Sequence, residues 1–144
     1  MSADLTVIIL AYNEERHLAR CLRSLQGVAK RAVVVDCFST DRTVAIAQEH
    51  GADVVQHAWV NYATQFNWAL DNVAIDTQWT MRLDADEVVT PELAEALKRE
   101  LAHSPETIRG LTVNRQIHFL GRWIRHGGIY PLRMLRVWRT GHGR

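Results

Sequence analysis

The sequence predicts an α/β protein with a mostly parallel sheet and helices on both of its faces. Short apolar runs rich in valine and isoleucine, typical of strands buried on both sides, recur along the first part of the chain. Between them stand stretches whose apolar residues recur at helical spacing. This alternation, with short connections, is typical of parallel strands joined through helices.

The first strand is expected at Leu5 to Leu10, where LTVIIL forms a continuous apolar run. Asn13 is expected to cap the helix that follows, because its side chain can accept a hydrogen bond from a free backbone N–H. Four apolar residues at helical spacing form the buried face of this helix: Leu18, Cys21, Leu22 and Leu25. Gly27 is expected to end it.

The second strand is expected at Ala32 to Val35 and stops at Asp36. A short helix follows and runs through His50, with Gly51 in the position where glycine commonly closes a helix. Three residues are candidates for its N-cap: Ser39, Thr40 and Asp41. Asp53 to His57 is the third expected strand.

The third helix leads to the fourth strand. Five residues mark one face of this helix: Tyr62, Phe66, Ala69, Leu70 and Val73. The strand is expected at Trp79 to Leu83 and leads directly into the acidic stretch Asp84 to Glu87. A fourth helix is expected to start at Thr90-Pro91, because proline is favoured at the first helical position. Its buried stripe is formed by Leu93, Leu97 and Leu101.

After Pro105 the pattern changes to strands. Leu111 to Phe119 is expected to form one longer strand, Gly127-Gly128 a turn, and Met134 to Trp138 another strand. The sequence contains no repeat and no linker-like stretch. We therefore expect one domain over residues 1–144, with residues 105–144 as a distinct part of it.

Length and composition are those of an ordinary soluble domain. The chain has 144 residues, of which 47% are hydrophobic and 23% charged. Its two cysteines are too few for a disulfide framework or a zinc site. No apolar run approaches the roughly 20 residues of a membrane-spanning helix, and no signal peptide is recognisable. A cytoplasmic protein is therefore expected.

The net charge of +1 hides an uneven distribution. Residues up to 106 carry 9 Lys and Arg against all 16 Asp and Glu, whereas residues 107–144 carry 8 arginines and no acid. An arginine-rich terminal segment of this kind favours an anionic partner, such as phosphates, an anionic membrane or nucleic acid. The alternative is that these arginines pair with the acidic first part of the chain.

Polar residues follow three of the four expected parallel strands, where ligands bind in open α/β sheets. The strongest of these signals is Asp84 and Asp86, directly after a buried strand. Carboxylate oxygens are ligands that Mg²⁺ and Mn²⁺ prefer, commonly together with substrate phosphates. The pair therefore indicates a metal site, although both carboxylates could instead cap the turn into the Pro91 helix.

The other candidates each have a structural alternative. Tyr12 could stack on a nucleobase or pack beneath its loop. Asp36 could accept a hydrogen bond from a base or a ribose, or cap the next helix. Gln65 and Asn67 could order the site or lie on an exposed helix face. The seven histidines form no metal-ligand pair at helical spacing and are expected to be structural or on the surface.

Taken together, these segments resemble the family 2 glycosyltransferases, which adopt the Rossmann-like GT-A fold. The resemblance starts at residue 5 and is carried by VIILAYNEERHLARCLRSL at 7–25, VVVDCFSTDRT at 33–43, QFNWAL at 65–70 and RLDADE at 82–87. The segment GRWIRHGGIYPLRMLRVWR at 121–139 is similar to bacterial lipopolysaccharide-core glucosyltransferases. This order and spacing of motifs is highly specific.

The resemblance implies inverting transfer of a hexose from a nucleoside diphosphate sugar, usually UDP-linked, to a glycan or glycolipid acceptor of the cell envelope. Four residues would line the nucleotide pocket: Ala11, Tyr12, Asn13 and Glu14. Asp36 would hold the base or ribose, Asp84 the ribose or sugar, and Asp86 the metal, Mg²⁺ or Mn²⁺. Residues 105–144 would begin the acceptor side, with peripheral contact to the inner membrane and no nucleic-acid partner.

Two departures from the family pattern bear on function. Cys37 stands where many members have a second acid, and the family's general base lies beyond the segment matching 121–139, so the chain resembles a truncated member. One alternative is therefore a fragment that binds the nucleotide sugar without transferring it. Another is a haloacid-dehalogenase-like phosphatase, because Asp84 to Val88 also fits D-x-D-x-[TV], with Asp84 as the nucleophile.

Overall fold

A six-stranded sheet organises the computed structural model of the chain, which describes residues 2–103, 110–115, 117–119, 122–124 and 132–141. The strands are β1 (Ala3–Ala11), β2 (Ala29–Asp36), β3 (Asp53–Gln56), β4 (Trp79–Asp84), β5 (Gly110–Arg115), β6 (Ile117–Phe119), β7 (Arg122–Ile124) and β8 (Leu132–Arg139). The helices are α1 (Leu18–Leu25), α2 (Thr43–Glu49), α3 (Tyr62–Asn72) and α4 (Pro91–His103).

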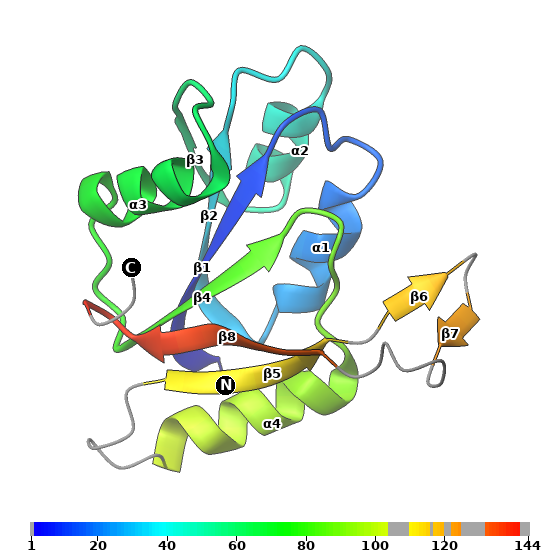
Figure 1. Ribbon diagram of the computed structural model, residues 1–144, viewed down its shortest axis with the longest axis vertical. Coiled ribbons are helices and arrows are strands. Elements are labelled where there is room, and N and C mark those ends of the chain that lie inside the picture. Colours follow the sequence, from blue (N-terminus) through cyan, green and yellow to red (C-terminus); the bar gives the residue numbers. More distant parts are fainter. Residues whose placement is uncertain (1, 104–109, 116, 120–121, 125–131, 142–144) are drawn as a thin grey trace.

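The main sheet has the strand order β3-β2-β1-β4-β8-β5 and is mostly parallel. Strands β1 to β4 run parallel to one another, whereas β8 pairs antiparallel with both β4 and β5. A separate two-stranded sheet, β6-β7, lies apart from it (Figure 1). The connections from β1 to β4 each pass through a helix, as the alternation of the sequence predicts.

Helices cover both faces of the sheet, as expected (Figure 1). On one face, alternate residues of β1 (Leu5, Val7 and Ile9) pack with the apolar sides of α1, α2 and α4. On the other face, Ile8 and Leu10 pack with α3 and with Trp138 of β8. Because β1 is buried on both sides, its apolar run has no polar alternation.

Both predicted N-caps are wrong. The α1 helix begins at Leu18 with His17 as its N-cap, and Asn13 lies at φ +50 in the preceding loop, where its side chain accepts from another loop. For α2 the N-cap is Arg42 rather than Ser39, Thr40 or Asp41. Asp41 still accepts from Thr43 N at 2.9 Å, so its carboxylate satisfies one of the free N–H groups of the first turn.

The helix ends and the last helix start match the sequence signals. Gly27 and Gly51 lie at φ +76 and +77, where glycine avoids the strain of a side chain. The α4 helix starts at Pro91, and the Thr90 hydroxyl accepts from Leu93 N at 3.2 Å. Its residues Leu97 and Leu101 are buried in the core.

The predicted single strand Leu111 to Phe119 is wrong. Gly110–Arg115 forms β5 at the edge of the main sheet, while Ile117–Phe119 forms β6 and pairs with β7 instead. The change of partner divides a stretch that reads as one strand in the sequence. The expected strand Met134 to Trp138 is part of β8, and the expected Gly127-Gly128 turn lies outside the described residues.

Within the described part of the chain, every helix is too short or too polar to cross a lipid bilayer. Of the eight arginines after residue 106, Arg139 is the one whose side chain the structure describes, with Cζ 4.3 Å from the centroid of the Trp79 ring. The predicted contact of this arginine-rich segment with an anionic partner therefore concerns side chains outside the described set.

Candidate functional site

Three parallel strands end at the same level of the sheet and bring the predicted site residues together. Ala11 pairs with Asp36 across β1 and β2, and Leu10 pairs with Asp84 across β1 and β4. The loops leaving these strands therefore start side by side at the edge of the sheet formed by the carboxyl ends of its parallel strands (Figure 1). This edge is the position at which open α/β sheets bind their ligands.

A hollow of about 180 Å³ opens at this edge. It is lined by Leu10 and Ala11 at the end of β1 and by Tyr12 and Glu14 from the loop that follows. Two further aromatic residues line it, Trp59 from the segment that leads into α3 and Tyr62 from the first position of that helix. Tyr12 is 56% exposed and Trp59 is 50% exposed, so both rings are accessible to a ligand.

The loops after β1 and β2 are held together by hydrogen bonds between them. Asn13 N donates to Ser39 Oγ at 2.8 Å, and Asn13 Oδ1 accepts from Thr40 N at 2.9 Å. One residue further on, Glu14 N donates to Thr43 Oγ1 at 2.8 Å. The predicted helix cap Asn13 thus ties one site loop to the other.

Asp36 is fully buried at the end of β2, and its carboxylate has partners within the protein. Oδ2 accepts from Ser39 N at 2.9 Å and from Gln56 Nε2 at 3.1 Å, and Oδ1 accepts from Ser39 Oγ at 2.5 Å. These contacts fold the loop after β2 back onto the strand end. In this structure the carboxylate organises the loop, and its predicted contact with a base or ribose stays a prediction.

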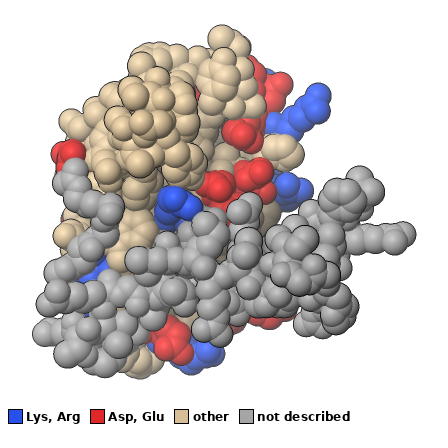
Figure 2. All heavy atoms as spheres, viewed as in Figure 1, with Lys and Arg blue, Asp and Glu red and all other residues tan. Residues whose placement is uncertain are grey.

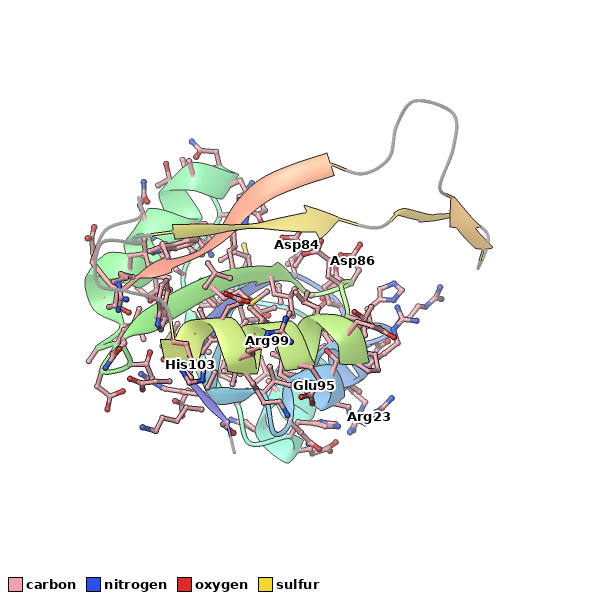
Figure 3. The ribbon with its side chains drawn as sticks, turned by 90° about the horizontal axis from the view of Figure 1, so that it is seen from below. Arg23, Asp84, Asp86, Glu95, Arg99 and His103 are labelled. Carbon is pink, nitrogen blue, oxygen red and sulfur yellow. The ribbon has the colours of Figure 1, made fainter. Side chains whose placement is uncertain are left out.

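Asp84 is the last residue of β4 and Asp86 lies in the turn that follows, and the two are close together, apart from the labelled residues of α4 (Figure 3). The Tyr62 hydroxyl donates to Asp84 Oδ1. Asp84 N donates to Glu87 Oε1 at 2.8 Å, and Glu87 N donates to the Asp84 carbonyl at 2.9 Å, which closes a tight turn. Asp86 lies within this turn and its side chain is exposed.

The acidic side chains at this edge repel one another. Burial raises the pKa of Glu14 above its ordinary value, and the neighbouring charges of Asp86, Asp41 and Asp84 raise it further, while His17 opposes them. Figure 2 shows acidic side chains gathered on this face of the molecule. Such crowding favours a bound cation, because a cation replaces repulsion with attraction.

Among the described residues, no three His, Cys, Asp or Glu side chains already stand in an arrangement that could hold a metal ion. The predicted metal role of Asp86 therefore stays a prediction. Oxygen ligands from only one or two carboxylates, completed by substrate phosphates and water, are the usual set for Mg²⁺. The chemistry of the donor set fits such an ion.

The sequence did not single out Trp59 as a contributor to this edge, and it indicated Ser39 only as a helix cap. Trp59 does have a sequence signal, because it is an aromatic residue shortly before Asn61. Asn61 caps α3, since its Oδ1 accepts from Thr64 N at 2.8 Å. The sequence left open whether Gln65 orders the site or lies on an exposed helix face. It is buried, lines the hollow and exchanges hydrogen bonds with His57 at 2.7 and 3.0 Å.

The two cysteines are expected to differ sharply in reactivity. Burial, with the charges of Glu87, Asp86 and Asp84, raises the pKa of the Cys21 thiol to about 12. The thiolate is the nucleophile, so Cys21 should stay unmodified until the pH approaches this value. Cys37 is half-buried and lines the hollow. Maleimide at pH 8 should therefore modify Cys37 alone in the folded protein.

Peptide mapping by mass spectrometry checks this expectation. Cys37→Ser should abolish labelling of the folded protein, Cys21→Ser should leave it unchanged, and both thiols should react in denaturant. Equal labelling rates for the two thiols in the folded protein would contradict the described burial of Cys21.

The chain is thus an α/β protein with helices on both faces of its sheet. A hollow lies beyond the strand ends with carboxylates beside it, which is where proteins of this class commonly bind ligands. The chain belongs to the glycosyl transferase family 2, whose sequence model matches residues 6–142. This membership confirms the resemblance seen in the motifs and leaves the phosphatase alternative without support.

Curated relatives agree with the family. Lipopolysaccharide core biosynthesis glycosyltransferase LpsC of Rhizobium meliloti is 34% identical over 145 residues, which cover 97% of this chain and 52% of LpsC. The uncharacterized glycosyltransferase RC0292 of Rickettsia conorii is 33% identical over 98 residues, covering 68% of this chain and 34% of the relative. The chain thus spans about half or less of the length of these relatives.

Solved structures agree with the fold. The mannosyltransferase PcManGT of Pyrobaculum calidifontis, in complex with GDP-Man and Mn²⁺, superposes with a TM-score of 0.62 at 21% identity, over 80% of this chain and 36% of that one. S. aureus TarS 1–349 superposes with a TM-score of 0.62 at 20% identity, over 94% of this chain and 47% of that one. The predicted GT-A fold is confirmed.

Proposed function

We propose that this chain provides the donor-binding part of an inverting glycosyltransferase. In this proposal a hexose passes from a nucleoside diphosphate sugar, UDP-linked, to a glycan or glycolipid acceptor in cell-envelope polysaccharide synthesis. The observation that carries the proposal is the meeting of the aromatic-walled hollow with the acidic group at one level of the sheet. Such a site offers an apolar surface on which a base can stack. Its carboxylates can bind a diphosphate through a cation.

Relatives and neighbours support the chemical class. LpsC is named for lipopolysaccharide core biosynthesis. Glucosyl-3-phosphoglycerate synthase of Mycobacterium tuberculosis, a fold neighbour at 19% identity and a TM-score of 0.56, was crystallised with Mn²⁺, UDP and glucosyl-3-phosphoglycerate. The arginine-rich end of the present chain suits an anionic acceptor or the anionic face of the inner membrane.

The residues at the edge divide the work of donor binding. Tyr12 offers an exposed ring for stacking on the base, and Ala11 and Glu14 line the hollow beside it. Asn13 completes the nucleotide pocket by tying its loop to the loop after β2. Asp36 fixes the loop on the base and ribose side through its bonds to Ser39 and Gln56.

Asp84 presents its carboxylate to the ribose or sugar hydroxyls, and Asp86 holds Mg²⁺ or Mn²⁺. When bound, the cation stabilises the negative charge of the departing diphosphate. Glu87 is unsuited to act as the base for the acceptor, because Oε1 of its carboxylate accepts from Asp84 N and so holds the turn. The role of Glu87 is therefore to keep Asp84 and Asp86 in place.

Isothermal titration calorimetry tests this proposal with UDP, and then UDP-glucose, in the presence and absence of Mn²⁺. The wild type is expected to bind both ligands only with the metal. Asp86→Ala should weaken binding at least about 30-fold, a loss of ~2 kcal/mol. The matched control is Asp76→Ala, which removes an exposed carboxylate before β4, at the opposite end of that strand.

Binding by Asp86→Ala at the strength of the wild type would contradict the metal role. Binding without sugar transfer to any envelope glycan would favour the alternative of a part that binds the donor alone. If the folded wild type binds neither ligand with or without Mn²⁺, the proposed function is wrong.

A further inference from the structure

We infer that Tyr62 is a positioning residue, which sets the orientation of the Asp84 carboxylate toward the donor sugar or ribose. The inference deepens the proposed function and rests on it. None of the sequence motifs or comparisons assigns Tyr62 a role, and its place on the expected apolar face of α3 suggested only packing.

The start of α3 holds the Tyr62 ring at the mouth of the hollow. Asn61 caps the helix through its bond from Thr64 N, so that Tyr62 is the first helical residue. The Cζ atom of Arg82 lies 4.9 Å from the ring centroid, and the Trp59 ring meets the Tyr62 ring edge-on, with centroids 6.2 Å apart at 81°. The guanidinium of Arg82 over the Tyr62 ring and the Trp59 ring beside it restrict the Tyr62 ring to one orientation.

The Tyr62 hydroxyl reaches from this position to the end of β4, where it donates to Asp84 Oδ1. The backbone of Asp84 is held separately, since its N–H donates to Glu87 Oε1. The turn thus fixes where Asp84 lies, and the hydroxyl fixes where its carboxylate points. A carboxylate has about four acceptor positions, so this single bond leaves most of them to a ligand.

A fixed carboxylate matters here because its neighbours carry the same charge. Asp84 and Asp86 both act on Glu14 strongly enough to contribute to its raised pKa, which places all three carboxyl groups within electrostatic reach. Without a donor to hold it, the Asp84 side chain would turn away from these charges and toward water. The hydroxyl of Tyr62, a residue that itself lines the hollow, keeps it at the hollow's edge.

The test is a double-mutant cycle on UDP-glucose binding with Mn²⁺, using Tyr62→Phe, Asp84→Ala and the double variant. Tyr62→Phe keeps the ring and its contacts with Arg82 and Trp59 but removes the hydroxyl. It is expected to raise the Kd about 5–10-fold in the wild-type background, in line with the usual net contribution of a single hydrogen bond, because this bond is exposed to solvent. In the Asp84→Ala background it should have no further effect.

Thr64→Val is the matched control, because it removes an exposed hydroxyl from the same turn of α3 and should bind as the wild type does. Thermal unfolding of every variant separates binding effects from loss of folding. Unchanged binding by Tyr62→Phe, or an equal loss in both backgrounds, would overturn the inference while the proposed function stood. A wild type that does not bind UDP-glucose would overturn both.

Discussion

Replacing Asp36 with alanine is expected to lower the free energy of unfolding by about 2–4 kcal/mol and to weaken nucleotide binding. The Asp36 carboxylate is fully buried and accepts from Ser39 N, Ser39 Oγ and Gln56 Nε2. Its removal leaves the N–H and hydroxyl of the half-buried Ser39 without their partner and empties a buried position at the end of β2, whereas the exposed Gln56 can turn to water. Urea unfolding gives the stability change, and calorimetry with UDP and Mn²⁺ gives the change in binding.

The control is Asp53→Ala in the neighbouring strand β3, where an exposed carboxylate pairs with Arg31 at 2.7 Å. An exposed ion pair is worth little, so this change should cost less than about 1 kcal/mol. A cost for Asp36→Ala as small as that of the control would show that the carboxylate does not organise the loop.

Ser39→Ala distinguishes the two roles of Asp36. It removes the hydroxyl that links Asp36 to Asn13 N but keeps the carboxylate itself. If Asp36 acts by organising the loops, Ser39→Ala should weaken UDP binding in the same direction as Asp36→Ala. If Asp36 contacts the nucleotide directly, Ser39→Ala should lower stability and leave UDP binding close to that of the wild type.

The parallel part of the fold was predictable because each of its strands and helices has a pattern that can be recognised in the local sequence. The apolar run of β1 and the spacing of Leu18, Cys21, Leu22 and Leu25 on α1 depend only on neighbours in the chain. In the antiparallel part, β8 pairs with the distant strand β4, and its own residues carry no signal for that partner. Ile117–Phe119 reads as a continuation of β5, but it pairs with β7, the next strand along the chain. The residue pattern does not mark where β5 ends and this second pairing begins.

The same distinction applies to the site. The position of Asp84 and Asp86 directly after a buried strand was visible in the sequence, and the structure places them at the edge where ligands bind. The partner of Asp84 was not visible, because Tyr62 is 22 residues away and belongs to another element. For Asn13 the local signal is misleading. Its residue type predicts a cap on the next helix, but in the structure it forms hydrogen bonds with Ser39 and Thr40 of another loop.

Trp79→Ala is expected to destabilise the protein by about 3–5 kcal/mol, the usual cost of removing a large buried aromatic side chain. Trp79 is the first residue of β4, it is fully buried, and it pairs with Leu5 of β1 on one side and Arg139 of β8 on the other. Its indole therefore lies in the core where the parallel and antiparallel halves of the sheet join, and its removal opens a cavity there. Trp79→Phe should cost much less, because it keeps a ring and removes an indole N–H that has no hydrogen-bond partner in the structure.

Trp59→Ala is the matched control. The Trp59 ring is half exposed, so this substitution should change the unfolding free energy by only about 0.5 kcal/mol. Urea unfolding of the three variants measures these differences. A cost for Trp79→Ala no larger than that for Trp59→Ala would contradict the burial of Trp79, and with it the junction of β1, β4 and β8 that positions Asp84 at the far end of the same strand.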